Sequence, residues 1–339
     1  MVDATLEFEA HRARLFGIAY RMLGSASEAE DLVQEAYLRW ERADRDAVAA
    51  PGAWPAKVVT NLSLNELASA RVRREQYVGQ WLPEPVLTTA DGTIHGVAGT
   101  GGTGARAARQ PLGPLETVEQ RDSVSFALLL LLERLTPPER AVFVLREAFG
   151  YPHRDIAELL ETSEANSRQL HRRARQAIGR DASAAHTGAT GTPATPATKG
   201  AGGGTGGGAP VRQRWTGLVE TFVAAAREGD LRQLERLLTE DVVSYADGGG
   251  RINTARRPIL GRAKVARYLA GGLARFAAAT VLVPCEVNGG PALLALADGG
   301  LLGVVTLEVA EGRIAALRIC VSPDKIAYAA RQFAASAPS

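Results

Sequence analysis

The chain has 339 residues, of which 46% are hydrophobic and 22% charged, and its formal net charge is +2 at pH 7. This length exceeds one typical core and predicts two or three domains of ordinary globular composition. No apolar run reaches the roughly 18 residues that a membrane span needs, and the N-terminal stretch lacks the pattern of a secretion signal. We therefore expect a cytoplasmic protein that does not contact a membrane.

Residues that could carry redox or metal chemistry are sparse. Cys285 and Cys320 lie in apolar, strand-like segments, which favours two buried free thiols over a cross-strand disulfide. Five scattered histidines show no metal-ligand spacing, so we expect no metal and no cofactor. Acids exceed bases in the first 46 residues, whereas residues 168–180 contain five arginines and no acid, which indicates two different partners.

Two segments, residues 88–111 and 181–210, are rich in Gly, Ala and Thr and contain almost no large apolar side chains. Such segments cannot bury enough surface to offset their ordering entropy, so we expect flexible linkers. They divide the chain into domains at residues 1–87, 112–180 and 211–339.

The first domain is predicted to be a small helical bundle. Apolar residues recur at helical intervals in "EFEAHRARLFGIAYRML" and in "AEDLVQEAYLRWERA", and Ser27 with Glu30 has the spacing of a capping box. A third helix, in "AWPAKVVTNLSLNELASARVRRE", ends in a basic cluster.

The second domain has the layout of a helix-turn-helix. Thr136 is expected to cap a helix whose first turn contains Pro137 and Pro138, where proline is tolerated. A short helix, "HRDIAELL", the turn "ETS" and a longer helix from about Glu164 to Ile178 then follow. The longer helix could enter a DNA major groove and bring its arginines to phosphates, or it could be a solvated basic face.

The third domain changes character. Helices come first, and Gly-punctuated apolar segments of strand length follow, as in "ATVLVPCEVNG" and "GLLGVVTLEVAEG". This order predicts an α+β domain in which an antiparallel meander curves around helices.

Two segments together resemble the extracytoplasmic-function (ECF) RNA polymerase sigma factors. "AEDLVQEAYLRWERA" is similar to the helix that binds the clamp helices of the largest polymerase subunit, and "LTPPERAVFVLREAFGYPHRDIAELLETSEANSRQLHRRARQAI" is similar to the domain that reads the −35 promoter element. The resemblance implies an all-α sigma-2 bundle at 1–87 and an all-α helix-turn-helix sigma-4 domain at 112–180. It also implies core RNA polymerase, including its flap, and promoter DNA as partners.

The C-terminal domain resembles the SnoaL-like domains of the NTF2-like cone fold that are fused to sigma factors of the ECF41 and SigJ-like group. The motifs "WLPEP", "DGGGR" and "SPDKI" carry this resemblance, although Ser322 and Ile326 depart from the usual "NPDKL".

Candidate contact residues follow from these matches. The polymerase would be bound by Glu30, Asp31, Gln34 and Glu35, although a merely solvated face is the alternative. The −10 element would be bound by Lys57, Asn61, Asn65, Arg71, Arg73 and Arg74. The −35 element would be bound by Asn166, Ser167, Arg168, Gln169, His171, Arg172 and Arg175.

The C-terminal domain is expected to regulate in cis rather than to catalyse. Residues 211–339 contain no histidine, and their aspartates adjoin Gly, Pro or helix ends, where aspartate commonly serves turns. "DGGGR" lacks the spacing and lysine of a phosphate-binding loop, so we expect a contact tip, flanked by opposite charges, whose partner is the sigma core near "WLPEP". A ligand-sensing pocket or, less readily, an enzyme site inside the cone are the alternatives. The regulatory contacts would come from Trp81, Leu82, Pro83, Asp247, Gly248, Gly249, Gly250, Arg251, Pro323, Asp324 and Lys325.

Overall fold

The computed structural model describes residues 4–44, 53–88, 125–185, 209–276 and 280–336. The chain forms two compact units, which we call the helical unit (residues 1–75 and 94–180) and the C-terminal unit (residues 76–93 and 181–339). Most of the two predicted linkers, and residues 112–124 of the expected sigma-4 domain, lie outside the described residues.

The first three helices of the helical unit are α1 (Ala4–Leu23), α2 (Ala26–Arg42) and α3 (Trp54–Glu75). They pack around buried side chains such as Phe8, Tyr20 and Trp40, which confirms the expected bundle. The helix cap differs from the prediction, because the left-handed Gly24 (φ 67°) ends α1 and Ser25 caps α2 by accepting from the Glu28 N–H at 3.2 Å. Ser27 already lies inside the helix.

The second half of this unit contains α5 (Phe126–Leu132), α6 (Pro137–Phe143), the π-helical η2 (Val144–Ala148), α7 (His153–Leu159) and α8 (Glu164–Ala185). Thr136 precedes α6, and its hydroxyl and N–H both donate to Glu139, which confirms the predicted start. Between α7 and α8 the chain turns through Glu161 (φ 51°), as a helix-turn-helix requires. Helix α8 is longer than predicted and continues into the stretch assigned to a linker.

A buried arginine joins the two halves of the helical unit. Arg140 is 2% exposed and donates to the carbonyl oxygens of Met22 (2.5 Å) and Leu132 (2.7 Å). Its guanidinium also pairs with Glu133 at 2.8 Å, and Arg74 from α3 pairs with the same carboxylate and reaches the Leu23 carbonyl. These arginines bind carbonyls at the end of α1 that no intrahelical N–H reaches. Both expected sigma domains lie within this one compact unit.

The C-terminal unit combines helices with a six-stranded sheet. Its elements are α9 (Ala209–Glu228), α10 (Leu231–Leu237), β1 (Leu238–Asp247), β2 (Ile259–Leu260), α11 (Arg262–Phe276), β3 (Val281–Val287), β4 (Gly290–Ala297), β5 (Gly300–Ala310), β6 (Arg313–Cys320) and α12 (Pro323–Ser336). Strand order is β2-β1-β6-β5-β4-β3. Strands β3 to β6 form the predicted antiparallel meander, but β1 pairs with β6 in parallel, so the sheet is mixed.

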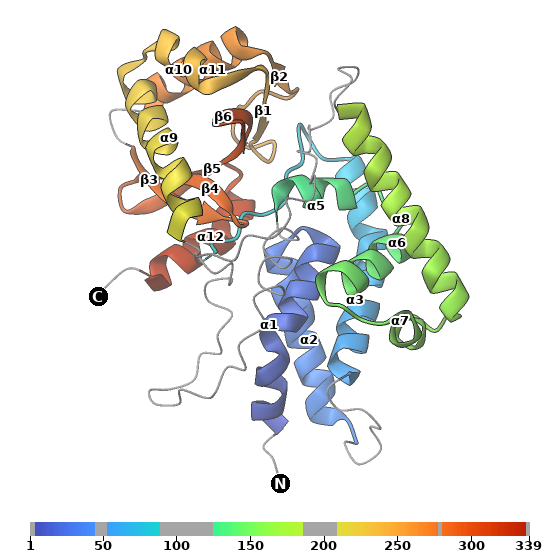
Figure 1. Ribbon diagram of the computed structural model, residues 1–339. Helices are drawn as coiled ribbons and strands as arrows, with labels where there is room; N and C mark the ends of the chain where they lie inside the picture. The colour runs from blue at the N-terminus through green and yellow to red at the C-terminus, as the bar shows by residue number, and fades with distance from the viewer. Residues whose placement is uncertain (1–3, 45–52, 89–124, 186–208, 277–279, 337–339) are drawn as a thin grey trace. The chain divides into compact units, whose positions relative to one another are not determined.

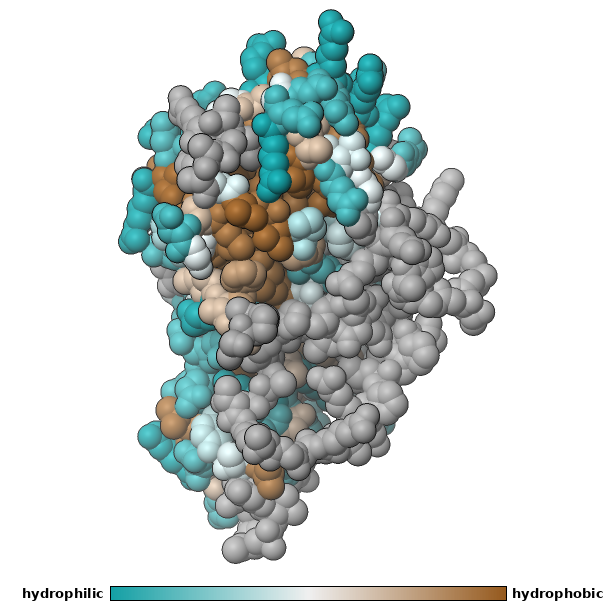
Figure 2. Space-filling model, turned by 90° about the vertical axis from the view of Figure 1, so that its left-hand side faces the viewer, coloured by the Kyte–Doolittle hydropathy of each residue, from teal (hydrophilic) through white to brown (hydrophobic). Residues whose placement is uncertain are grey.

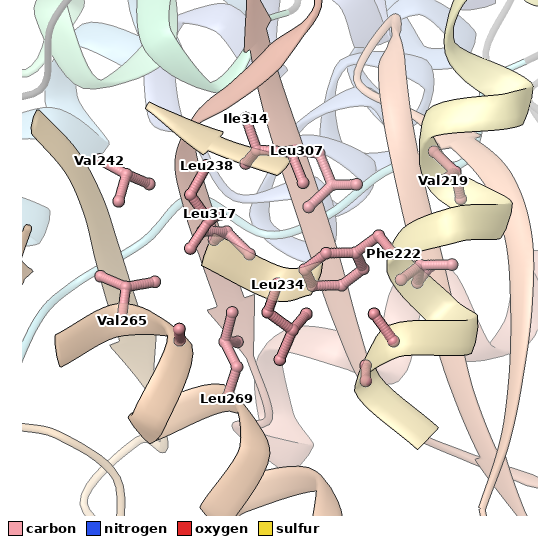
Figure 3. Packing of buried hydrophobic residues seen from close by; sticks show 14 residues of the cluster. Val219, Phe222, Leu234, Leu238, Val242, Val265, Leu269, Leu307, Ile314 and Leu317 are labelled. Carbon is pink, nitrogen blue, oxygen red and sulfur yellow. The ribbon is translucent and has the colours of Figure 1, made fainter. Parts of the chain in front are cut away.

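Helices α9, α10 and α11 lie on one face of this sheet (Figure 1). Phe222 and Leu234 from the helices meet Leu307 and Leu317 from the strands in an apolar cluster (Figure 3). Side chains alternate along a strand, so Val242 points into this cluster whereas Tyr245 and Asp247 of β1 point to the opposite face. Helix α12 packs against β5, and its Lys325 reaches Asp247 on that opposite face.

The two cysteines are free. Cys285 lies on β3 and Cys320 on β6, with β4 and β5 between them. Three strand spacings separate the two cysteine Cα atoms by about 14 Å, which is twice the reach of a disulfide. The prediction of two free thiols is confirmed, but only Cys320 is buried, whereas Cys285 is half-buried.

Part of the outer surface of the C-terminal unit is apolar (Figure 2). Large exposed side chains on its strands include Leu260, Val281 and Leu302. Across the described ranges, no helix combines the length and the hydropathy that crossing a membrane requires.

Candidate functional site

Residues 76–88, which we call the strap, lie across the C-terminal unit although the sequence placed residues 76–87 at the end of the first domain. Every strap residue from Leu82 to Thr88 is buried. The strap is held chiefly through its main chain, by side chains from β1, the β3–β4 turn and α12. These long-range bonds are the reason that the strap belongs to the C-terminal unit.

A buried ion pair between Asp247 and Lys325, whose charged atoms are 2.6 Å apart, holds the strap. We call this ion pair, together with its contacts to the strap, the latch. The Asp247 carboxylate also accepts from the Leu82 N–H at 2.9 Å and from the Tyr77 hydroxyl at 2.6 Å. Lys325 donates to the Leu82 carbonyl at 2.6 Å and lies over the rings of Tyr77 and Trp81, at 4.4 and 4.5 Å from their centroids. Both main-chain groups of Leu82 are therefore bonded by one ion pair.

Local sequence places the two charged partners side by side. Asp247 ends β1, and its carbonyl accepts from the N–H groups of Val321 and Ser322 at 2.9 and 3.1 Å. Ser322 directly precedes α12, and its carbonyl accepts from the N–H groups of Lys325 and Ile326 in the first turn of that helix. Lys325 thus lies in the first turn of a helix that starts beside Asp247.

The glycines of "DGGGR" allow this close approach. A Cβ on Gly248 would collide with the Ile252 carbonyl, and one on Gly249 would collide with the Ser322 hydroxyl. Gly249 also has φ +64°, in the left-handed region, and its N–H donates to Asp247 at 3.0 Å. The motif therefore brings the turn against the start of α12.

The environment of the latch perturbs its ionisable groups. Burial lowers the pKa of Lys325, and the Asp247 carboxylate opposes that shift. Burial also raises the pKa of Tyr77 well above its usual value, and the hydrogen bond to Asp247 adds to the rise. The Tyr77 hydroxyl is therefore a hydrogen-bond donor throughout the physiological pH range.

Two residues that sequence analysis missed hold the far end of the strap. Asn288 accepts from the Val86 N–H (3.1 Å) and its own N–H donates to the Val86 carbonyl (2.9 Å). Gln332 of α12 accepts from the Leu87 N–H (2.8 Å) and donates to the Leu87 carbonyl (3.3 Å). The "NGG" run at 288–290 signals a hairpin turn, but nothing in it signals that the asparagine side chain binds a distant segment.

The expected regulatory residues divide into two groups. Trp81, Leu82, Asp247 and Lys325 meet in the latch, and Pro83 is buried beside them. Pro323 is exposed at the start of α12, and Arg251 pairs with Asp324 at the surface, where their side chains are 67% and 70% exposed. Asp247 is therefore not part of an exposed tip of opposite charges, because it is buried at the end of β1.

The expected −35 residues also divide. Those exposed on α8 are Asn166, Arg168, Gln169, Arg172 and Arg175. Ser167 is fully buried and bonds His153, and the His171 side chain is 14% exposed and bonds Glu147. These two residues face inward in the structure, because their positions on α8 coincide with its packed side.

The expected −10 residues lie on α3. Lys57 pairs with Glu161 at 3.0 Å, Asn61 is half-buried, Asn65 is exposed and Arg74 pairs with Glu133. The side chains of Arg71 and Arg73 lie outside the described residues. Two of these cations, Lys57 and Arg74, are therefore paired with acids of the helix-turn-helix half.

The expected polymerase-binding residues lie on α2. Asp31 and Gln34 are exposed, whereas Glu30 pairs with Arg12 (3.4 Å) and Glu35 with Arg39 (2.9 Å).

Comparison with known proteins agrees with this organisation. Residues 8–73 match the family model for sigma-70 region 2, and residues 125–178 match the model for sigma-70 region 4. The chain is 36% identical over 335 residues to the ECF RNA polymerase sigma factor SigJ of Mycobacterium tuberculosis, covering 94% of this chain and 92% of SigJ. It is 30% identical to the probable ECF sigma factor SigI of the same organism, covering 94% and 93% of the two chains.

The crystal structure of SigJ is similar across both units. It aligns with a TM-score of 0.63 and 33% sequence identity, and the alignment covers 96% of this chain and 98% of the SigJ chain. The chain therefore belongs to the extracytoplasmic-function family of RNA polymerase sigma factors, the alternative sigma factors that direct transcription initiation.

Proposed function

We propose that the C-terminal unit, a SnoaL-like domain of the NTF2-like fold, regulates this sigma factor in cis by holding or releasing the strap. The observation that carries the proposal is the latch, in which the Asp247–Lys325 pair bonds both main-chain groups of Leu82. Helices packed on one face of a curved mixed sheet support the fold assignment.

The position of the strap in the chain supports a regulatory role. It follows α3, which carries the proposed −10 contacts, and precedes α5, where the helix-turn-helix half begins. An anchored strap takes 13 of the 50 residues that connect these helices. Because an anchored segment no longer adds to the reach of the connection, holding the strap restricts how far the two promoter-reading halves can separate.

The proposed contacts in transcription follow the family. Exposed acids and amides of α2 bind the clamp helices of the largest polymerase subunit, α3 binds the −10 element, and exposed residues at the start of α8 read the −35 element. The sigma-4 half also binds the polymerase flap. The ion pairs that Lys57 and Arg74 make with Glu161 and Glu133 must open before these cations can bind DNA.

The test is run-off transcription with core RNA polymerase, from a promoter recovered by selection with the holoenzyme. One truncation after residue 210 removes the regulatory domain, and a second after residue 320 removes α12 with Lys325 and Gln332. Lys325→Met keeps α12 and removes the ammonium with its hydrogen bonds to Leu82 and Asp247. We expect the truncation at 320 and Lys325→Met to change transcript yield in the same direction, because both release the strap.

Asp324→Asn is the matched control, since it changes the adjacent but exposed carboxylate of α12. If both truncations and Lys325→Met transcribe like the full chain, the C-terminal unit is not a regulator. If none of the proteins supports polymerase-dependent run-off, the sigma assignment itself fails.

A further inference from the structure

Two histidines lie at the inner side of helix α8, His153 on α7 and His171 on α8 itself. The His153 Nδ1 of α7 lies 2.9 Å from the Ser167 hydroxyl, and the His171 Nε2 of α8 lies 2.6 Å from Glu147 Oε1 of η2. The two imidazole rings are in contact with each other, with centroids 5.4 Å apart, and Phe143 of α6 lies against His171. One polar cluster thus ties α8 to both α7 and η2.

The cluster lies directly behind the residues proposed to read DNA. Ser167 and His171 are four residues apart and share the inner face of α8, while Asn166, Arg168 and Gln169 are exposed around Ser167. A change in the rotation of α8 by even part of a turn would re-aim these exposed side chains. Base-edge hydrogen bonds tolerate little displacement, so the inner contacts bear on promoter recognition.

We propose that His153 and His171 are positioning residues for −35 recognition, which set the rotation of α8 through Ser167 and Glu147 without touching DNA. The inference rests on the proposed reading of the −35 element by α8. It assigns His171 and Ser167 a different role from the direct DNA contacts that their place in the sequence indicates.

The charges around the cluster make this positioning depend on pH. From α8, the groups Glu164, Arg168 and His171 face His153, and η2 contributes Arg146 and Glu147. Burial lowers the pKa of His153 from 6.5, the neighbours His171, Arg146 and Arg168 lower it further, and Glu164 opposes them. The packed arrangement therefore binds a proton on His153 less readily than an opened arrangement does.

The stability of the packed arrangement depends on pH. Above pH 6.5 the packed arrangement carries its full stability, and this contribution is lost as the pH falls through the lowered pKa of His153. Acidification should therefore weaken the contacts of His153 and His171 that fix the rotation of α8.

The two roles of the histidines predict opposite effects of acid on DNA binding. A histidine that contacts phosphate gains a positive charge at low pH and strengthens binding. A positioning pair loses its geometry and weakens binding. The experiment measures the affinity of the holoenzyme for the selected promoter duplex at about pH 7.5 and about pH 5.5.

His153→Asn and His171→Gln keep a hydrogen-bonding group near Nδ1 and Nε2 but cannot titrate. We expect the wild-type affinity to fall about three- to tenfold on acidification, the equivalent of one net hydrogen bond. The double variant should lose that acid dependence, while His11→Gln on α1 should behave like the wild type. In the full chain, the ring-proton NMR titration of His153 should move to higher pH in His171→Gln.

Affinity that rises on acidification of the wild type and not of the double variant would overturn the inference. So would a salt slope that falls by about 0.9 in His171→Gln, because that is the loss of one phosphate contact. Arg172→Ala tests the placement of α8 on DNA separately from the role of the two histidines. If it leaves affinity and salt slope unchanged, the proposed placement of α8 on DNA fails, whatever the histidine variants do.

Discussion

Asp247→Asn should release the strap without unfolding the C-terminal unit. The Asp247 side chain has no exposed surface and accepts from Lys325, Tyr77, Leu82 and Gly249. An asparagine keeps one acceptor oxygen but leaves the Lys325 ammonium buried without a counter-charge. Removal of one partner from a buried ion pair costs about 3–5 kcal/mol.

This cost converts into a measurable opening of the strap. We take the lower bound of this range, about 3 kcal/mol. Each 1.4 kcal/mol is a factor of ten, so the open population of the strap should rise by about a hundredfold. Hydrogen exchange followed by mass spectrometry reports it, since the amides of Leu82, Val86 and Leu87 are bonded in the closed form.

The controls separate the latch from general destabilisation. Amides of β4 and β5 should keep their protection in Asp247→Asn, and Asp324→Asn should change strap exchange less than about fivefold, because its exposed pair contributes under about 1 kcal/mol. The double variant Asp247→Asn/Lys325→Met should exchange more slowly than Asp247→Asn alone, since no charge then remains buried. Unchanged strap protection in Asp247→Asn, or an equal loss across the sheet, would refute the reasoning.

Three further measurements test other parts of the structure. Burial raises the pKa of the Cys320 thiol to about 12, and Asp247 adds to the rise. The rate at which a thiol reagent labels Cys320 at pH 8 should therefore be about a thousandfold lower than for a thiol of pKa 9. This rate should increase with pH and should be higher in Asp247→Asn. Arg172→Ala should lower the slope of log affinity against log salt by about 0.9 in holoenzyme binding, and an unchanged slope would place that side chain away from DNA. Arg140→Met should lower the free energy of unfolding by about 3–5 kcal/mol in a urea titration, because it leaves Glu133 and the end of α1 without this partner. The control Arg134→Met, at an exposed position, should change the free energy of unfolding by less than about 0.5 kcal/mol.

Much of the fold was predictable because its signals are local. The helix-turn-helix follows from Thr136 with two prolines, a turn at Glu161 and a helix rich in arginine, all of which act within a few residues. The antiparallel meander follows from Gly-punctuated apolar segments. The parallel pairing of β1 with β6 was missed, because no local pattern records which strand lies next to which.

The site was predictable as a set of motifs and not as an arrangement. The sequence predicts an exposed contact tip that Asp247 and Arg251 flank with opposite charges. The carboxylate instead pairs with Lys325, and Arg251 pairs with Asp324 at the surface. Burial decides this difference, since Asp247 at the end of a central strand loses its solvation and must be compensated by a partner in the same buried layer.

The sequence by itself determined the family, the order of the helices and strands, and the three motifs of the latch, because periodicity, turn residues and short motifs are written in neighbouring positions. Only the tertiary structure decided that Leu82 meets a carboxylate 165 residues away, that Asn288 and Gln332 hold the far end of the strap, and that Ser167 and His171 face inward. Desolvation and pairing of a polar group depend on what the fold packs around it, and that information is spread over the whole chain.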